Sequence, residues 1–396
     1  MRHIDFNNKK VLVRVDFNVP LNDQMEVTDT TRIEKAIPTL QYMLDHGAAL
    51  IVCTHLGRPK PGADNSKYST QHIVPVFSKL LGREVQFVDD VVGEKVEAAC
   101  RDLQAGQVLL LENTRFYKEE TDGEASFSKA LASLADVYVN DAFGTAHRAH
   151  ASTTTVANYF DKDHKGFGFL MEAEVKNGFK VLKEAEKPFT AIVGGAKVSD
   201  KIQLLENLIE KADNILIGGG MAYTFFKAQG GQIGNSLCEA DFLNLALEVL
   251  QKAAAKGCNI YLPQDSIAAD KFAVDAQIQT IESNAIPDGW MGLDIGPLAV
   301  KAFCDVIASS KTIVWNGPMG VFEFPNFANG TLSVAHAVAD ATKNGAFSLI
   351  GGGDSVSAIN KAGLENEVSY VSTGGGAMLE MLEGKILPGV AAIEEN

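Results

Sequence analysis

The chain has 396 residues, of which 46% are hydrophobic and 21% are charged. This length exceeds that of one ordinary core and favours two domains of similar size, and the composition is that of a globular protein. Because 50 acidic residues outnumber 35 basic ones and the net charge is −15, non-specific binding to nucleic acid or to a membrane surface is disfavoured. A site for anions on this chain must therefore be locally basic.

The sequence shows no targeting or redox feature. It contains no apolar run long enough to cross a membrane, and its first residues lack the apolar stretch of a signal peptide, so we expect a cytoplasmic protein. The cysteines are scattered and form no CxxC pair, so neither a disulfide framework nor a zinc site is expected. They are Cys53, Cys100, Cys238, Cys258 and Cys304.

Short apolar runs alternate with helix-period segments along nearly the whole chain, which is the pattern of parallel strands joined by crossover helices. The fold class predicted is therefore α/β. Open α/β sheets bind ligands beyond the carboxyl ends of their strands, so the residues just after each strand are the candidates for function. The expected strands are 11–15, 49–53, 108–111 and 137–139 in the first half, and 191–193, 215–217, 259–262, 313–315 and 347–350 in the second.

A connecting helix is predicted between the halves. Apolar residues recur at helical spacing from Phe169 to Leu182, and Pro188 opens the next strand region. We place the domain boundary near residues 168–187.

Polar or cationic side chains come after all the expected strands of the first half, and Arg32 lies at an expected helix start. A guanidinium binds phosphate or carboxylate through two parallel hydrogen bonds. Taken singly, each residue is as readily a turn former or a surface cation. Their coincidence at one sheet edge predicts a site for a multiply anionic small molecule. The residues after the strands are Asp16, Asn18, His55, Arg58, Arg115, His147, Arg148 and His150.

Glycine clusters mark the second half. AIVGGAK, ILIGGG and SLIGGGDS come after apolar runs, and VSTGGGAMLE opens an expected helix. Glycine lets backbone amides approach a phosphate, and a helix N-terminus adds donors, although tight strand–helix turns explain a single cluster equally well. No GxxxxGK[ST] occurs and no clean GxGxxG precedes an acidic residue, so neither the P-loop nor the dinucleotide fingerprint is present.

Charged residues near these glycines have two interpretations each. Lys197 and Lys201 share one face of an expected helix start and either reach phosphate oxygens or are solvated. Asp354 is either a ligand of Mg²⁺ or a capping carboxylate. Glu323 either bonds ribose hydroxyls or is a surface acid.

Nine segments in this order resemble phosphoglycerate kinase, and the match spans almost the whole chain: RVDFNVP, THLGRP, LLLENTRF, NDAFGTAHR, GGAKVSDKI, IGGGMAYTF, WNGPMGVFE, GGGDS and STGGGA. The resemblance implies two Rossmann-like domains, each a parallel sheet flanked by helices, joined by a hinge helix across a central cleft. It implies domain limits of 1–168, 169–187 for the hinge and 188–382, with 383–396 packing back on the first domain. Ser355 and Thr54 depart from the family's usual threonine and serine, and each keeps a hydroxyl.

The resemblance also assigns the ligands. The first domain is expected to bind 3-phosphoglycerate or 1,3-bisphosphoglycerate, and the second ADP or ATP with Mg²⁺ held by Asp354. Residues expected to contact the triose are Asp16, Phe17, Asn18, Arg32, His55, Leu56, Gly57, Arg58, Arg115 and Arg148. Residues expected to contact the nucleotide are Lys201, Gly219, Asn316, Glu323, Gly352, Gly353, Asp354 and Ser355.

The chemistry expected is direct phosphoryl transfer after domain closure, without a phosphoenzyme. Arg32 and Lys197 are expected to converge on the transferring group, with the amides of Gly374, Gly375 and Gly376. We expect a monomer with small-molecule partners only. The rival hypotheses are an NAD-dependent dehydrogenase, which lacks its fingerprint here, and an inert metabolite-binding scaffold, which the retained Arg32, Lys197, Lys201 and Asp354 disfavour.

Overall fold

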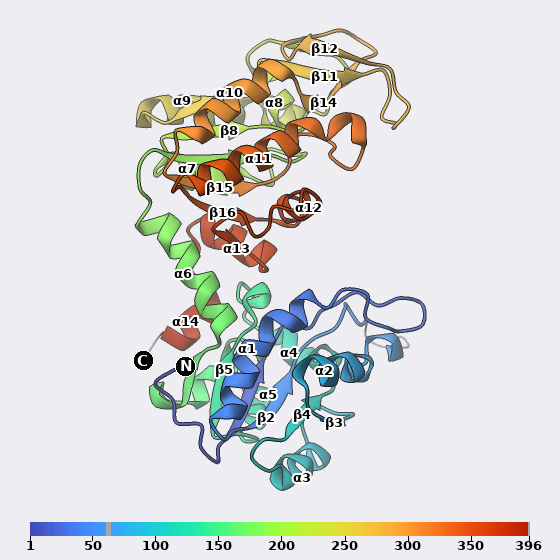
Figure 1. Cartoon of the computed structure of the whole chain (residues 1–396), viewed down its shortest axis with the longest axis vertical. Helices are drawn as coiled ribbons and strands as arrows, with labels where there is room; N and C mark the ends of the chain where they lie inside the picture. The colour runs from blue at the N-terminus through green and yellow to red at the C-terminus, as the bar shows by residue number, and fades with distance from the viewer. Residues whose placement is uncertain (61–64, 395–396) are drawn as a thin grey trace. The chain divides into compact units, whose positions relative to one another are not determined.

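The computed structural model describes residues 1–60 and 65–394 (Figure 1). Contacts divide the chain into unit 1, Met1–Lys176 with Ile386–Asn396, and unit 2, Asn177–Lys385. The predicted connecting helix is present as α6 (Phe169–Lys183), and the division between the units falls inside it. No helix in the described ranges is long and apolar enough to span a membrane.

Unit 1 is built on a parallel six-stranded sheet of order β3-β4-β2-β1-β5-β6. Its central strand, β1, is paired on both sides, so that Val11 lies between Leu50 and Val137. The strands are β1 (Lys10–Arg14), β2 (Ala49–Cys53), β3 (Val85–Val88), β4 (Val108–Leu111), β5 (Val137–Asn140) and β6 (Lys165–Phe167). The sequence did not predict β3 or β6, because the first is a half-exposed edge strand and the second has three residues.

Helices cover both faces of this sheet, so its inner strands are apolar on both sides. Val11 and Val13 belong to one core cluster, and Leu12 to a second cluster on the opposite face. The helices are α1 (Thr31–Asp45), α2 (Val74–Leu81), α3 (Glu94–Asp102), α4 (Lys118–Asp122) and α5 (Ala125–Ala132). Short 3-10 helices lie at η1 (Ser66–Tyr68), η2 (Thr70–Ile73), η3 (Thr114–Phe116), η4 (Phe143–Thr145), η5 (Thr155–Tyr159) and η6 (Lys162–His164).

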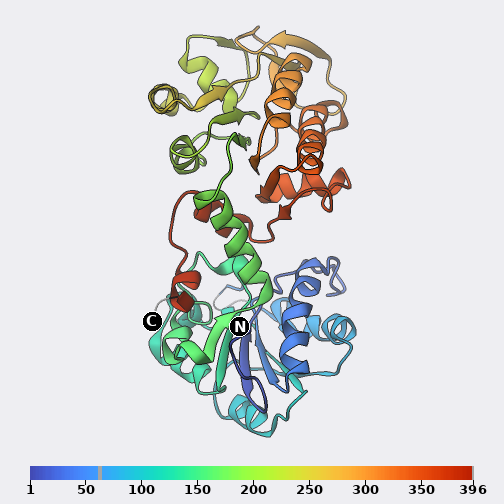
Figure 2. The same cartoon turned by 60° about the vertical axis from the view of Figure 1, so that its left-hand side comes forward.

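The C-terminal helix α14 (Pro388–Glu394) packs on unit 1, as the red end of the chain in Figure 2 shows. The backbone N–H of Gly389 donates to the carbonyl of Ala146 at 2.8 Å, and Lys165 Nζ donates to the carbonyl of Ala392 at 3.0 Å. Residues 383–385 belong to unit 2. The C-terminal segment of the chain therefore completes the fold of unit 1.

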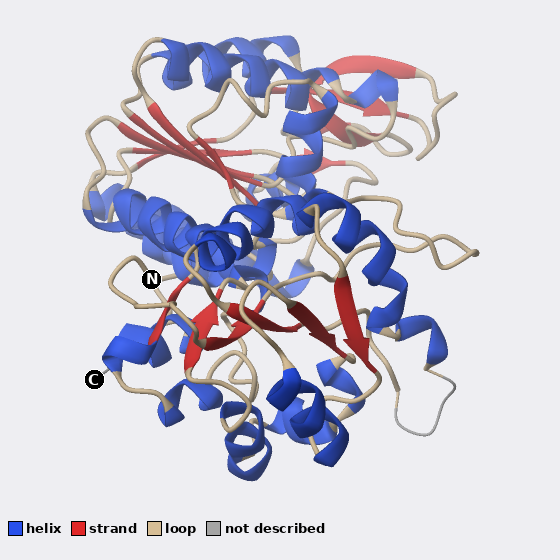
Figure 3. Cartoon of the chain, turned by 60° about the horizontal axis from the view of Figure 1, so that its bottom comes forward, coloured by secondary structure: helices blue, strands red, loops and turns tan. Residues whose placement is uncertain are grey.

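Unit 2 has a second parallel six-stranded sheet, of order β10-β8-β7-β15-β16-β17. Its strands are β7 (Phe189–Val193), β8 (Asn214–Ile217), β10 (Asn259–Tyr261), β15 (Thr312–Asn316), β16 (Phe347–Gly351) and β17 (Tyr370–Val371). Helices flank it on both faces (Figure 3). They are α7 (Ile202–Ile209), α8 (Met221–Ala228), α9 (Leu243–Lys256), α10 (Pro297–Ala308), α11 (Asn329–Lys343), α12 (Gly353–Lys361) and α13 (Gly375–Leu382), with η7 (Ala240–Phe242) and η8 (Pro325–Phe327). The predicted α/β class is thus confirmed.

Two small sheets of unit 2 were not predicted. One is antiparallel, of β11 (Asp265–Ala269), β12 (Ile278–Glu282) and β14 (Met291–Ile295), and the other pairs β9 (Gln232–Ile233) with β13 (Ala285–Ile286). β12 is mostly exposed, and β9 and β13 have two residues each. β11 and β14 are largely buried, but polar residues interrupt them, so none of the five strands forms the continuous apolar run that marked the other strands. β14 supplies one wall of a cavity described below.

Candidate functional site

The loops beyond the carboxyl ends of β1, β2, β4 and β5 surround a cavity of about 750 Å³ in unit 1, which we call the basic cavity. Parallel pairing brings these loops to one sheet edge although they are far apart in sequence. Of the residues predicted to bind the triose, those that line the cavity are Asp16, Asn18, Arg32, His55, Arg58, Arg115 and Arg148. His147 and His150, also singled out in the sequence, line it too.

Phe17, Leu56 and Gly57 do not line the basic cavity. Phe17 and Leu56 are buried in the core of unit 1, with 0% and 2% of their surface exposed. Gly57 acts through its backbone: its N–H donates to Asn18 Oδ1 at 2.8 Å and its carbonyl accepts from Arg115 Nη1 at 2.9 Å. These bonds fix the loop after β2 between two residues of the cavity.

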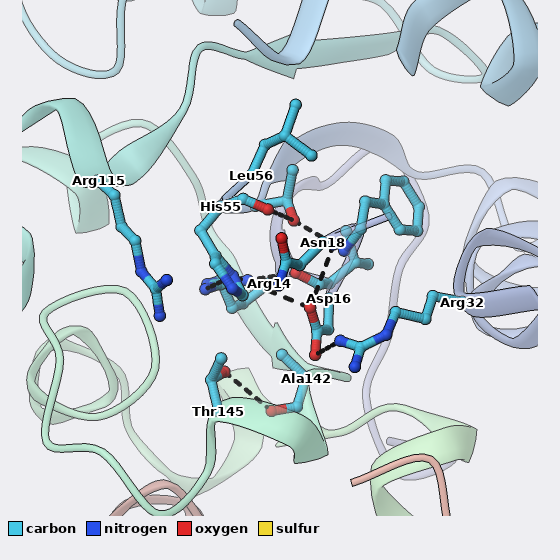
Figure 4. A network of polar contacts seen from close by, with 12 residues as sticks. Arg14, Asp16, Asn18, Arg32, His55, Leu56, Arg115, Ala142 and Thr145 are labelled. Carbon is cyan, nitrogen blue, oxygen red and sulfur yellow. Dashed lines mark hydrogen bonds and ion pairs between the residues drawn. The ribbon is translucent and has the colours of Figure 1, made fainter. Parts of the chain in front are cut away.

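Asp16 is the acidic partner inside this cationic site. It forms an ion pair with Arg32 Nη1, and its other oxygen lies 3.9 Å from His55 Nδ1 (Figure 4). The Arg32 side chain is 39% exposed and that of Asp16 only 9%. Arg32 therefore reaches the cavity from the start of α1 while a buried carboxylate orients it.

The positive charge of the cavity comes from its arginines and lysines, whereas two of its histidines, His55 and His150, stay neutral. Burial, and then the charges of Arg14 and Arg115, hold the pKa of His55 well below its usual range. Burial and neighbouring arginines lower the pKa of His150 to about 4. Burial also lowers the pKa of Arg115, to about 10, which leaves it protonated at neutral pH. The cavity thus suits a ligand with several negative charges.

Unit 2 has a cavity of about 470 Å³, which we call the apolar cavity, between glycine loops and the small antiparallel sheet. Its walls include Leu237 and Phe272, which are 49% and 60% exposed. Gly219, Glu323 and Asp354, all predicted to contact a nucleotide, line it as well. Large apolar side chains left open in such a cavity provide a surface for a flat apolar group.

Close backbone packing explains several of the glycines without any ligand. Gly219 has φ +72°, and a Cβ there would lie 2.6 Å from the carbonyl oxygen of Gly195. A Cβ on Gly194 would lie 2.0 Å from the carbonyl oxygen of Pro318. The loops after β7, β8 and β15 therefore touch backbone to backbone and form one floor of the apolar cavity.

A polar cluster joins the loops after β15 and β16 to the start of α7. Lys201 Nζ donates to Asn316 Oδ1, and Ser355 Oγ accepts from the backbone N–H of Gly317 at 2.6 Å. Asn316 Nδ2 is buried and has no hydrogen-bond partner among the described residues. Burial lowers the pKa of Lys201, and the nearby carboxylates of Asp200 and Asp354 partly offset this effect.

The family model of phosphoglycerate kinase matches residues 1–385 of this chain. The chain belongs to this family. A phosphoglycerate kinase of Porphyromonas gingivalis is 53% identical over 417 residues, covering 100% of this chain and 99% of that protein. A cytosolic phosphoglycerate kinase of Nicotiana tabacum is 52% identical over 395 residues, covering 100% and 98%.

Solved structures of phosphoglycerate kinases have the same fold. The structure from Coxiella burnetii superimposes with a TM-score of 0.91 at 40% identity, and that from Pyrococcus horikoshii with 0.83 at 32%. Each comparison covers 100% of this chain and 98% of the other. The family relationship therefore holds over both units.

Within this family fold, the structure separates the other predicted residues from the apolar cavity. Lys197 is exposed on the loop after β7. Gly353 lies at the start of α12, where a Cβ would meet nothing within 4 Å. Gly374, Gly375 and Gly376 lie at the start of α13, and the N–H of Gly374 donates to Ser372 Oγ at 3.1 Å. Gly352 adjoins Asn316, because a Cβ there would lie 2.9 Å from Asn316 Nδ2.

Sequence reasoning missed several residues of both cavities. Lys118 and Gly144 line the basic cavity, and Leu237 and Phe272 line the apolar one. Arg14 is fully buried at the end of β1, and its Nη2 lies 3.2 Å from His55 Nδ1 (Figure 4). Arg14 had a signal in the sequence, because an arginine inside the apolar run VLVRV must find a buried partner.

Proposed function

We propose that the basic cavity of unit 1 binds the triose substrate of the family reaction and that the apolar cavity of unit 2 binds the nucleotide. The activity of the family, and of this chain, is that of phosphoglycerate kinase: an ATP-dependent phosphotransferase of glycolysis with a carboxyl group as acceptor. The observation that supports the assignment of sites is a cavity lined by arginines in a chain whose net charge is −15.

The basic cavity matches the chemistry of 3-phosphoglycerate. This ligand carries a phosphate and a carboxylate, both of which planar guanidinium groups bind through paired hydrogen bonds. Arg58, Arg115 and Arg148 line the cavity and hold no carboxylate in an ion pair within the described residues. Apart from the Nη1 bond of Arg115 to Gly57, their donors are therefore available to a ligand, whereas Arg32 is already oriented by Asp16.

The apolar cavity matches a nucleotide in three parts. Leu237, Phe272 and Val321 offer apolar contacts to a base. Glu323 lines the same cavity and supplies a carboxylate for ribose hydroxyls. Lys201 and the N-terminus of α12 supply the positive end that phosphates need.

The residues also fit Mg²⁺ bound together with the nucleotide. Asp354 is an exposed carboxylate that lines the apolar cavity from the first turn of α12. Mg²⁺ in kinases is commonly held by one or two carboxylates together with substrate phosphates, so no all-protein cage is required. When bound, the ion would neutralise charge on the phosphates, and Asp354 would hold it.

The reaction proposed is a direct in-line transfer. A carboxylate oxygen of 3-phosphoglycerate forms a bond to the γ-phosphorus of ATP while the bond from that phosphorus to the oxygen of ADP breaks; the reverse reaction gives ATP from 1,3-bisphosphoglycerate. No side chain acts as a nucleophile. Arg32 and Lys197 are the proposed donors to the transferring group, with the amides of Gly374, Gly375 and Gly376. Domain closure, a monomeric state, the absence of nucleic-acid or membrane partners, and a cytoplasmic location are part of the same proposal.

A coupled assay tests these roles. The purified protein is mixed with 3-phosphoglycerate, MgATP, NADH and glyceraldehyde-3-phosphate dehydrogenase, and the loss of NADH is followed. We expect Arg32→Ala and Lys197→Ala each to lower kcat by about a hundredfold or more, as losing one preorganised donor costs ~3 kcal/mol. Arg101→Ala and Lys256→Ala, which remove exposed cations of units 1 and 2, serve as matched controls.

The outcomes separate activity from residue roles. Unchanged circular dichroism spectra establish that the variants are folded. Full activity in either Arg32→Ala or Lys197→Ala would refute the role given to that residue and leave the family activity intact. A folded wild-type protein with no turnover would favour the inert scaffold, and binding of NADH by the free protein would favour the dehydrogenase.

A further inference from the structure

A buried chain of polar groups lies behind the basic cavity, and none of the proposed catalytic roles uses it. It begins at Arg14, whose guanidinium is fully buried at the end of β1. Arg14 Nε donates to Ser152 Oγ at 2.8 Å, Nη1 donates to the carbonyl of Val15, and Nη2 lies 3.2 Å from His55 Nδ1. The guanidinium thus connects Ser152 to a histidine of the cavity.

Glu120 of α4 lies at the other end of this chain and is also fully buried. Its Oε1 accepts from Ser152 Oγ at 2.5 Å, and its Oε2 accepts from the backbone N–H of Ser152 at 2.8 Å. The carbonyl of Glu120 accepts from the N–H of Ala151 at 2.8 Å. Both oxygens of the Glu120 carboxylate therefore accept from Ser152.

The direction of each hydrogen bond in this chain is determined by chemistry. A guanidinium has donors only and a carboxylate has acceptors only. The Ser152 hydroxyl must therefore give its proton to Glu120 and accept from Arg14 Nε. By the same rule, Nη2 of Arg14 donates to His55, so that His55 Nδ1 is the acceptor.

An accepting Nδ1 fixes the tautomer of His55. A neutral imidazole with an unprotonated Nδ1 carries its proton on Nε2. That nitrogen has no hydrogen-bond partner in the described ranges, and the ring lines the basic cavity. Among the described residues no carboxylate makes a direct ion pair with Arg14, so Glu120 offsets its charge only through Ser152.

We propose that Glu120 is a positioning residue that acts through Ser152 and Arg14 to hold His55 as the neutral Nε2–H tautomer, so that the ring presents an N–H donor to the anionic substrate. This inference rests on the proposed use of the basic cavity as the triose site. The orientation of Arg14 is the step that matters. Without the Ser152 acceptor, Nε of Arg14 loses its partner and the contact from Nη2 to His55 is no longer held.

A purely structural role for Glu120 makes a different prediction. In that case Glu120 only fastens residues 151 and 152, and its loss lowers stability without changing the proton position on His55. The tautomer of His55 therefore distinguishes the two roles. It can be measured in the ligand-free protein, independently of any substrate.

The experiment uses full-length protein with ¹⁵N-labelled histidine, and long-range ¹H–¹⁵N spectra that report the tautomer of each ring. His55→Asn assigns the signal among the 8 histidines. We expect wild type to show an unprotonated Nδ1 and a protonated Nε2. Glu120→Gln and Ser152→Ala are expected to give a mixture of both tautomers, while Glu124→Gln, which changes an exposed carboxylate four positions further on, leaves the spectrum unchanged.

Kinetics give the second measurement. We expect the KM for 3-phosphoglycerate to rise about tenfold in Glu120→Gln and Ser152→Ala, which corresponds to one hydrogen bond to a charged ligand, with the KM for ATP unchanged. A wild-type tautomer in folded Glu120→Gln or, should that variant not fold, in Ser152→Ala would overturn the proposal. A His55 signal that has the expected tautomer but does not respond to 3-phosphoglycerate would instead refute the assignment of the cavity as the triose site.

Discussion

The two cavities stand at equivalent edges of two parallel sheets but differ in the groups they offer a ligand. The basic cavity presents side chains, mainly guanidinium groups on loops fixed by hydrogen bonds such as that from Arg115 to Gly57. The apolar cavity presents backbone and apolar walls, with Gly219 and Gly195 in close contact beneath Leu237 and Phe272. Two parallel sheets thus carry differently lined cavities, because the segments that follow their strands differ.

This difference predicts how each site responds to substitution. A side-chain site loses affinity when one cation is removed, while the scaffold around it persists. A backbone site has few side chains to remove and is instead disrupted when a side chain is added. A substitution in one cavity should therefore change the KM of one substrate only, and the two KM values test the difference between the cavities.

The largest effect is expected for Arg115→Ala, which removes a half-buried guanidinium from the basic cavity. Losing hydrogen bonds between charged groups costs about 3 kcal/mol, so the KM for 3-phosphoglycerate should rise roughly a hundredfold while the KM for ATP stays constant. Arg115→Lys keeps a charge without the planar fork of a guanidinium, so its KM for 3-phosphoglycerate should lie between those of wild type and Arg115→Ala. Arg101→Ala is the exposed control. An equal rise in both KM values would show that the two sites are not independent.

A smaller effect is expected for Gly219→Ala in the apolar cavity, and it should fall on the KM for ATP instead of the KM for 3-phosphoglycerate. The new methyl would lie 2.6 Å from the carbonyl oxygen of Gly195, at a φ of +72° that disfavours alanine. We expect the KM for ATP to rise about tenfold, with a loss of roughly 1–3 kcal/mol of stability from the strained backbone. Gly230→Ala has φ +87° and open space around the new methyl, so it shows the strain without the collision. Equal KM values for ATP in Gly219→Ala and Gly230→Ala would contradict this prediction.

The sequence predicted the fold class and singled out the four arginines that line the basic cavity, because both leave local signals. Buried parallel strands read as continuous apolar runs, and cations directly after them, such as Arg58 and Arg148, reach one edge by topology alone. The walls of the apolar cavity have no such signal. Phe272 comes after β11 and Leu237 after β9, and neither short sheet has the apolar pattern of the parallel strands.

The roles of glycines and of buried polar groups were equally hidden from the sequence. A glycine cluster has the same letters whether it binds phosphate or packs on another loop, and only the contact of Gly194 with Pro318 shows that packing operates here. The chain from Glu120 through Ser152 to Arg14 joins residues up to 138 positions apart. No periodicity connects them, because the sheet alone brings them together.

A third effect, on stability and not on substrate binding, is a change in pH dependence caused by Asp294, a carboxyl group in the wall of the apolar cavity. Its oxygens accept from the N–H groups of Ile295 at 2.9 Å and Gly330 at 2.8 Å, yet burial raises its pKa to about 7. An unfolded chain has an ordinary aspartate pKa of about 3.9. Between these values the folded state holds a proton that the unfolded state has lost, so this group makes stability fall as pH rises from about 4 to about 7.

Asp294→Asn removes that titration because an amide does not ionise. The free energy of unfolding of the variant relative to wild type should therefore increase with pH across this window, by up to about 1.4 kcal/mol per pH unit, and level off above it. Asp340→Asn changes an exposed carboxyl of α11 and should give no such slope. Urea unfolding at several pH values measures the difference. A difference that stays constant from pH 4 to 7 would mean that Asp294 is charged throughout, and that the apolar cavity accepts a buried charge much as the basic cavity does.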